Sequence, residues 1–146
     1  MKYIAYGSNM VEKQMAVRCP AARVIGVGYL VGARLEFYLH ATVEKSGDPT
    51  DRVPVTIWEI TPEDESALDW YEGYPSYYTK ESWCVQMADG SEIEGMIYIM
   101  RTRRAAPPIP QYYKDIEDAY RKLGLSFQIR KVLRPAYERS IKRGYQ

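Results

Sequence analysis

The chain opens on the stretch YIAYGSNM at residues 3–10, which indicates how the fold begins. Residues 3–6 read as a short buried strand that stops at Gly7. Ser8 or Asn9 can cap a helix over about residues 10–18. A strand that turns through glycine into a helix gathers free backbone N–H groups at one point, and such a turn can bind a carboxylate or a phosphate. The alternative is a helix cap without a ligand.

The segments that follow this stretch read mainly as strands. Alternating or β-branched residues predict strands over residues 24–30, 34–40, 53–60, 78–87 and 92–100. Asp89-Gly90 is a hairpin signal between the last two. About six short strands with helices at a few junctions predict the α+β class, with a mixed, mostly antiparallel sheet curled into a small barrel and flanked by helices.

The segment from residue 61 to residue 73 predicts a helix with an unusual carboxylate at its end. Thr61 can cap it, Pro62 suits its first position and Gly73 can end it in the left-handed conformation. Glu72 then lies at the C-terminal end, where the helix dipole disfavours negative charge and raises the pKa of a carboxyl. Such a carboxylate could act as a general base near neutral pH. A solvent-exposed glutamate beside a helix stop is the alternative.

The C-terminal part of the chain predicts two more helices. Residues 112–123 show helical spacing with Gly124 as a stop, and a last helix starts near Ser126 with a kink at Pro135. This last helix is basic, and we expect its charges to form a solvated face rather than to bind nucleic acid. The charges are Arg130, Lys131, Arg134, Arg139, Lys142 and Arg143.

The length and composition fit one globular domain spanning residues 1–146. Apolar residues make up 46% of the chain, charged residues 27%, and the net charge is +1, so nothing points to nucleic acid or to a membrane. Tyrosine is abundant, with 14 residues against 2 phenylalanines. This excess fits either half-buried strands or a polar pocket with aromatic walls.

The few cysteine and histidine residues argue against a metal site. Cys19 and Cys84 have no paired spacing and read as free thiols of a reducing compartment. His40 is the single histidine, so we expect no Cys/His metal site. There is no signal-peptide pattern and no membrane-spanning run, which predicts a cytoplasmic protein.

Several of these segments, in this order, resemble the γ-glutamyl cyclotransferase/AIG2-like family over about residues 3–125. The resemblance rests on YIAYGSNM, on Leu68-Asp69 followed by Glu72-Gly73-Tyr74, on Tyr98-Ile99-Met100, and on the proline-rich connector and helix of residues 106–125. Trp58 departs from the family pattern, which often has a glycine within that strand. Residues 126–146 would form a basic helical extension of the same domain.

The resemblance implies a small barrel and a reaction without a metal or an organic cofactor. The α-amine of a γ-glutamyl substrate would attack its own γ-amide carbonyl, releasing 5-oxoproline and an amine or amino acid, with Glu72 as general acid and base. Backbone N–H groups of Gly7 and Ser8 would hold the substrate, and hydroxyls of Tyr78 and Tyr98 would donate hydrogen bonds. The implied binding residues are Tyr3, Ile4, Ala5, Tyr6, Gly7, Ser8, Asn9, Tyr78 and Tyr98.

The resemblance leaves the substrate's leaving group open. It could be an amino acid, a dipeptide, an amine or part of a biosynthetic intermediate, and the family suggests a link to glutathione metabolism. A homodimer is also left open. A different class of function is the alternative: a non-catalytic small-molecule binding or stress-response protein that keeps the family pocket.

Overall fold

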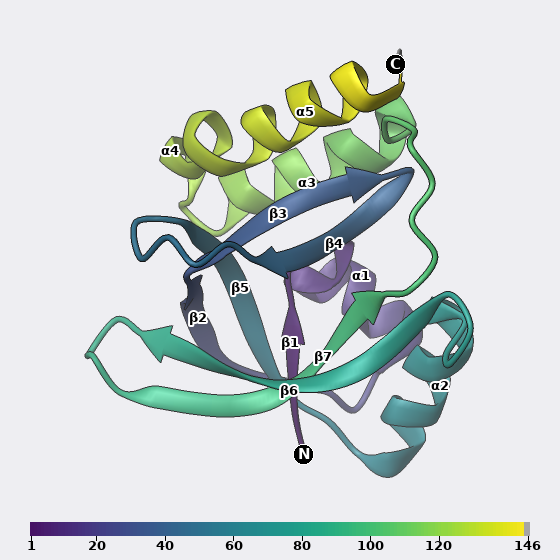
Figure 1. Ribbon diagram of the computed structural model, residues 1–146. Helices are drawn as coiled ribbons and strands as arrows, with labels where there is room; N and C mark the ends of the chain where they lie inside the picture. The colour runs from purple at the N-terminus through teal and green to yellow at the C-terminus, as the bar shows by residue number, and fades with distance from the viewer. Residues whose placement is uncertain (145–146) are drawn as a thin grey trace.

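A computed structural model describes residues 1–144 of the chain, and residues 145–146 of the expected C-terminal extension lie outside the described residues. A closed barrel of five strands, in the order β1-β5-β2-β6-β7, forms the centre of the molecule. A separate hairpin of two strands, β3 and β4, lies between the barrel and the C-terminal helices (Figure 1). The α+β barrel with flanking helices is therefore confirmed, with seven strands in place of about six.

The barrel strands pair mostly antiparallel and close through one parallel contact. β1 (Lys2–Ala5) and β2 (Arg23–Val31) both pair antiparallel with β5 (Arg52–Glu59). β6 (Tyr78–Met87) and β7 (Glu92–Met100) form the hairpin expected at Asp89-Gly90. The parallel pairing of Tyr3 on β1 with Met96 on β7 closes the barrel.

The strand missing from the sequence prediction is β4 (His40–Lys45), which pairs with β3 (Ala33–Tyr38). The turn between them passes through Leu39, whose φ of 66° is in the left-handed region. Hairpin turns of this kind normally use glycine, asparagine or aspartate. Because leucine gives no turn signal, the sequence did not show that the strand predicted over residues 34–40 ends at a turn and that a second strand follows.

The helix α2 (Pro62–Glu72) follows the predicted pattern at both ends. The Thr61 hydroxyl accepts a hydrogen bond from the Asp64 backbone N–H, and the Asp64 carboxylate accepts one from the Thr61 backbone N–H. Gly73 ends the helix with a φ of 65°. These two signals fix Glu72 as the last residue of α2.

The turn after β1 differs from its prediction. A 3₁₀ turn, η1 (Ser8–Met10), comes first, and α1 (Glu12–Arg18) begins only after Val11. Neither Ser8 nor Asn9 caps α1, because neither helix start has a side-chain cap. The Asn9 side chain instead hydrogen-bonds to Tyr3 and Arg18.

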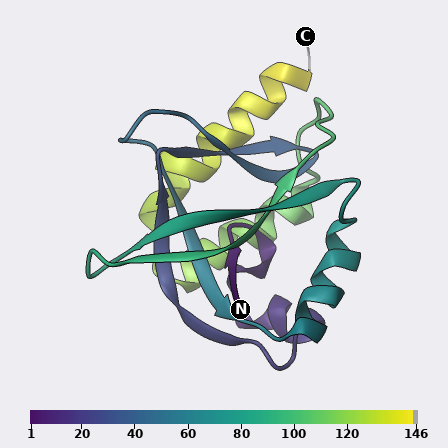
Figure 2. The same ribbon diagram turned by 60° about the horizontal axis from the view of Figure 1, so that its bottom comes forward.

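The C-terminal helices cover the β3–β4 hairpin (Figure 1, Figure 2). They are α3 (Pro110–Lys122), α4 (Ser126–Gln128), the π-helical segment η2 (Ile129–Leu133) and α5 (Arg134–Gly144). A proline interferes with the carbonyl four residues before it, so the wider π-helical turn just before Pro135 gives the expected irregularity a physical cause.

Two cations of α5 contradict the prediction of a solvated face. Arg139 and Arg143 donate to the carboxylate of Glu36, a residue of β3 that is only 4% exposed, at 2.8 and 2.9 Å. Arg139 also donates to the Leu35 carbonyl and Arg143 to the Phe37 carbonyl. These contacts fasten α5 to β3.

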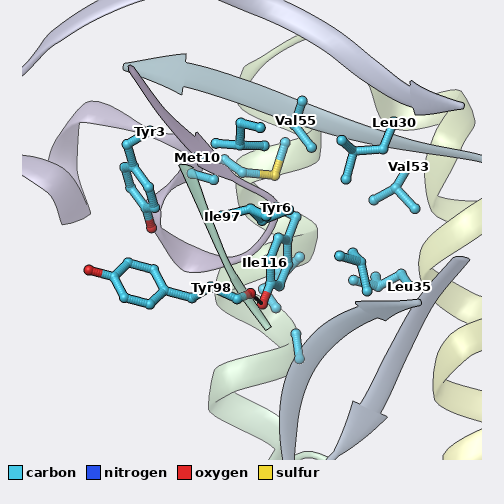
Figure 3. Close-up of a cluster of buried hydrophobic side chains, with 14 of the residues drawn as sticks. Tyr3, Tyr6, Met10, Leu30, Leu35, Val53, Val55, Ile97, Tyr98 and Ile116 are labelled. Atoms are coloured by element: carbon cyan, nitrogen blue, oxygen red, sulfur yellow. Dashed lines mark hydrogen bonds between the residues drawn. The ribbon is translucent and has the colours of Figure 1, made fainter. Parts of the chain in front are cut away.

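Apolar side chains from β1, β2, β5 and β7 meet inside the barrel together with Met10 of η1 and Ile116 of α3 (Figure 3). Tyr6 belongs to the same cluster, and its hydroxyl donates to the Tyr98 carbonyl on β7 at 2.6 Å (Figure 3). Packing against η1 and α3 therefore fixes the loop after β1 relative to the barrel.

We expect Gly28→Ala to destabilise the barrel by about 2–3 kcal/mol, because overpacking of a core typically costs this much. A Cβ at Gly28 would lie 2.6 Å from Val85 Cγ1 and 2.8 Å from the Gln86 carbonyl oxygen. Gly26→Ala is the matched control, since its Cβ would meet only the flexible Met87 Cε at 3.1 Å. Urea unfolding measures both variants, and equal losses would contradict the packing argument.

Candidate active site

A cavity of about 290 Å³ opens where β1, η1, the start of β4, the end of α2, the start of β6, β7 and the start of α3 come together. We call it the tyrosine cavity because seven of the chain's 14 tyrosines line it. Its lining residues are Tyr3, Ile4, Tyr6, Gly7, Ser8, Asn9, His40, Ala41, Tyr71, Glu72, Tyr77, Tyr78, Tyr98 and Tyr112.

The structure brings together nearly all residues singled out from the sequence. Glu72, Tyr78, Tyr98 and the β1–η1 segment all line the tyrosine cavity, although they come from five different elements. Ala5 is the exception: it is buried in the core and is absent from the lining. Trp58, which departs from the family pattern, also lies outside the cavity lining.

Glu72 is a half-buried carboxylate without a partner. No hydrogen bond or ion pair to its side chain is found within residues 1–144. Removal from water raises the pKa of Glu72 from 4.5 to about 7, and the positive charge of Arg18 lowers the pKa in part. A carboxyl with such a pKa can both accept and return a proton near neutral pH.

Two hydrogen bonds from side chains of β5 hold the Gly7-Ser8-Asn9 turn in place. The Trp58 indole N–H donates to the Asn9 carbonyl at 2.9 Å, and the Thr56 hydroxyl donates to the Met10 carbonyl at 2.8 Å. Because the first N–H groups of a helix have no partner within it, the Gly7 and Ser8 backbone can offer donors to a ligand. The hydrogen bonds to the Asn9 and Met10 carbonyls hold this turn in one conformation.

Arg18 and Asn9 form a second support for the cavity wall. The Arg18 guanidinium donates to Asn9 Oδ1 at 2.6 Å and lies 3.6 Å from the centre of the Tyr71 ring. Because a guanidinium only donates, the amide oxygen of Asn9 faces Arg18 and its NH₂ group faces Tyr3. Asn9 Nδ2 donates to the Tyr3 hydroxyl at 3.0 Å.

Three tyrosine hydroxyls of the cavity use their protons on protein acceptors. Tyr6 donates to the Tyr98 carbonyl, Tyr78 to the Ala41 carbonyl and Tyr98 to Asp69 Oδ1, each at 2.6 Å. Burial raises the pKa of all three hydroxyls, so they keep their protons. The resemblance implied that the Tyr78 and Tyr98 hydroxyls donate hydrogen bonds to the substrate. Because both protons are used on protein acceptors, these hydroxyls present oxygen lone pairs to a ligand instead.

Two other hydroxyls of the cavity accept a hydrogen bond and keep a proton to donate. Tyr3 accepts from Asn9, and Tyr112 accepts from the Ala41 backbone N–H at 3.1 Å. Burial raises the pKa of Tyr3 and of Tyr112, so both stay protonated. The cavity thus has a donor set and an acceptor set among its tyrosines.

Two lining residues had no predicted place in the site. They are Tyr112 and His40, whose Nδ1 lies 2.8 Å from the Tyr77 hydroxyl. Burial lowers the pKa of His40, so its imidazole is neutral at neutral pH. The excess of tyrosine in the sequence was a signal for a cavity with aromatic walls.

Within residues 1–144, no group of three or more His, Cys, Asp or Glu side chains is placed to hold a metal ion. In the same part of the chain, no helix has the length and apolar character needed to cross a membrane.

Comparison with known proteins gives consistent matches. The family model "Gamma-glutamyl cyclotransferase, AIG2-like" matches residues 3–118. Gamma-glutamylcyclotransferase from Bos taurus is 31% identical over 144 residues, covering 90% of this chain and 76% of that protein. The protein of the same name from Homo sapiens is 30% identical over 145 residues, with the same coverage. A solved structure of gamma-glutamyl cyclotransferase superposes with a TM-score of 0.80 at 29% identity, covering 91% of this chain and 85% of the other.

Proposed function

Because this chain belongs to the gamma-glutamyl cyclotransferase, AIG2-like family of enzymes, we propose that its tyrosine cavity converts a γ-glutamyl substrate to 5-oxoproline. The substrate's α-amine attacks the γ-amide carbonyl, a C–N bond closes the ring, and the former amide nitrogen leaves as an amine or amino acid. The nucleophile belongs to the substrate, so the protein has to fold the substrate back on itself and move protons.

One observation carries the proposal. The Glu72 carboxyl has no partner, burial raises its pKa to about 7, and it lines the tyrosine cavity beside the Gly7-Ser8 turn. In this role the Glu72 carboxylate removes a proton from the substrate's α-ammonium group, which frees the lone pair for attack. The protonated carboxyl then returns the proton to the leaving nitrogen.

The two sets of tyrosine hydroxyls match the charges of a γ-glutamyl group. Tyr6, Tyr78 and Tyr98 present lone pairs, which suit the α-ammonium group. Tyr3 and Tyr112 retain protons, which suit the α-carboxylate or the oxyanion that develops on the γ-carbonyl. The backbone N–H groups of Gly7 and Ser8 add donors of the second kind.

A substrate with a blocked amine tests the reaction class. We expect a γ-glutamyl amino acid to give 5-oxoproline, whereas its N-α-acetyl derivative gives no product because it has no free nucleophile. Chromatography of the released amino acid measures both reactions. Release from the acetylated substrate would indicate attack by water or by a protein group, and would contradict the proposal.

The pH dependence follows from the raised pKa of Glu72. A base has to be deprotonated, so we expect kcat/KM to fall about tenfold per pH unit below a midpoint of about 7 and to level off above it. Initial rates over a pH series measure the midpoint. A midpoint at the ordinary glutamate value of 4.5 would contradict the assignment.

A further inference from the structure

A second cavity, of about 330 Å³, lies between the start of β3, the start of β5 and the C-terminal helical segment. It shares no lining residue with the tyrosine cavity. Figure 1 shows this side of the molecule, where the connection between β4 and β5 approaches α4. We call it the basic cavity because Arg34, Arg52, Lys131 and Arg139 line it.

The positive charge of the basic cavity is not balanced by its carboxylates. Asp51 is the one acidic residue in the lining of the basic cavity. The buried Glu36, which is not part of the lining, pairs with Arg139 at 2.8 Å and with Arg34 at 3.4 Å. Within residues 1–144, neither Arg52 nor Lys131 makes an ion pair. Positive charges gathered in a concave site raise the local concentration of anions. This local excess stands out because the net charge of the whole chain is only +1.

The backbone beside the basic cavity is irregular in a specific way. The π-helical segment η2 buries Ile129 and Leu133 in the core and leaves Lys131 and Val132 in the cavity wall. Single π-helical turns of this kind occur often at functional sites. Gln128, which also lines the cavity, is 8% exposed, and its NH₂ group donates to the Tyr29 hydroxyl at 3.2 Å.

We propose that the basic cavity binds a small multivalent oxyanion of the phosphate type, such as a diphosphate or a phosphate ester. Arg52 and Lys131 supply the unpaired charge, and Arg34 adds a guanidinium whose planar fork matches phosphate oxygens. The volume lies at the lower end of small-molecule sites. The basic cavity opens to solvent, but no aromatic side chain lines it for base stacking, so it does not fit a nucleic-acid strand.

Calorimetry with pyrophosphate at low ionic strength tests the proposal. We expect saturable binding to one site per chain, weakened at least about tenfold in the double variant Arg52→Gln/Lys131→Gln. Lys13→Gln/Lys122→Gln is the matched control, because it removes the same charge from exposed positions outside the basic cavity. No saturable binding to the wild type, or an equal loss in the two variants, would overturn the proposal.

Amide chemical shifts of the wild type give a test that does not depend on the variants folding. We expect pyrophosphate to shift the amides of residues 33–35, 50–52 and 128–132. Shifts confined to residues 6–9 and 40–41, which lie at the tyrosine cavity, would place the anion there and overturn the proposal.

Discussion

Glu72→Gln is expected to reduce turnover of a γ-glutamyl substrate by about 10²–10⁴-fold, the range that general acid–base catalysis contributes. The amide of glutamine has nearly the size and shape of the carboxylate but cannot take up a proton. Because the Glu72 side chain makes no hydrogen bond or ion pair within residues 1–144, its replacement by glutamine breaks no polar contact among those residues. Single-turnover formation of 5-oxoproline measures the loss.

The stability of the same variant gives an internal check. A carboxyl whose pKa is raised to about 7 in the folded state stabilises the protein at low pH, and this contribution is lost as the pH rises through about 7. Above that pH the neutral glutamine should therefore melt no lower than the wild type. Glu63→Gln, on the exposed first turn of the same helix, is the matched control and should keep full turnover. Turnover retained in Glu72→Gln would refute the assignment.

Glu36→Gln is expected to destabilise the protein by about 3 kcal/mol, the lower end of the cost of breaking a buried ion pair. The substitution leaves the guanidinium groups of Arg139 and Arg143 without their shared counter-ion. The lower end applies because these side chains are 31% and 28% exposed, so water screens part of the loss. The midpoint of urea unfolding measures the effect.

The matched control for Glu36→Gln lies on α5 itself. Glu138 is exposed and makes no ion pair within residues 1–144, so Glu138→Gln should change stability by less than about 0.5 kcal/mol. Similar unfolding midpoints for Glu36→Gln and Glu138→Gln would mean that the Glu36 cluster does not fasten α5 to β3.

The sequence predicted best where local signals decide the structure. The Thr61 cap of α2, its Pro62 and its terminal Gly73 placed Glu72 at the end of the helix from local sequence alone. The β6–β7 hairpin was predicted equally well from its Asp89-Gly90 turn. Both depend on residues within a few positions of one another.

The rest of the site depends on contacts between distant segments. Tyr112 shows helical spacing with Ile116 and reads as a core residue, yet its hydroxyl reaches the Ala41 backbone, 71 positions away in the chain. Arg18 is part of the tyrosine cavity's support only because Asn9 and Tyr71 lie beside it in space. Arg139 and Arg143 looked solvated because Glu36, their partner, lies more than 100 positions earlier. No periodicity or motif encodes these pairs.

The most direct test of the central claim is the product balance with a panel of γ-glutamyl amino acids and γ-glutamylamines. We expect the preferred substrate to give 5-oxoproline and the released amine in equal amounts, because ring closure and release are one reaction. Release of glutamate in place of 5-oxoproline would show hydrolysis, and no product from any member of the panel would favour a binding protein. Either result would contradict the account.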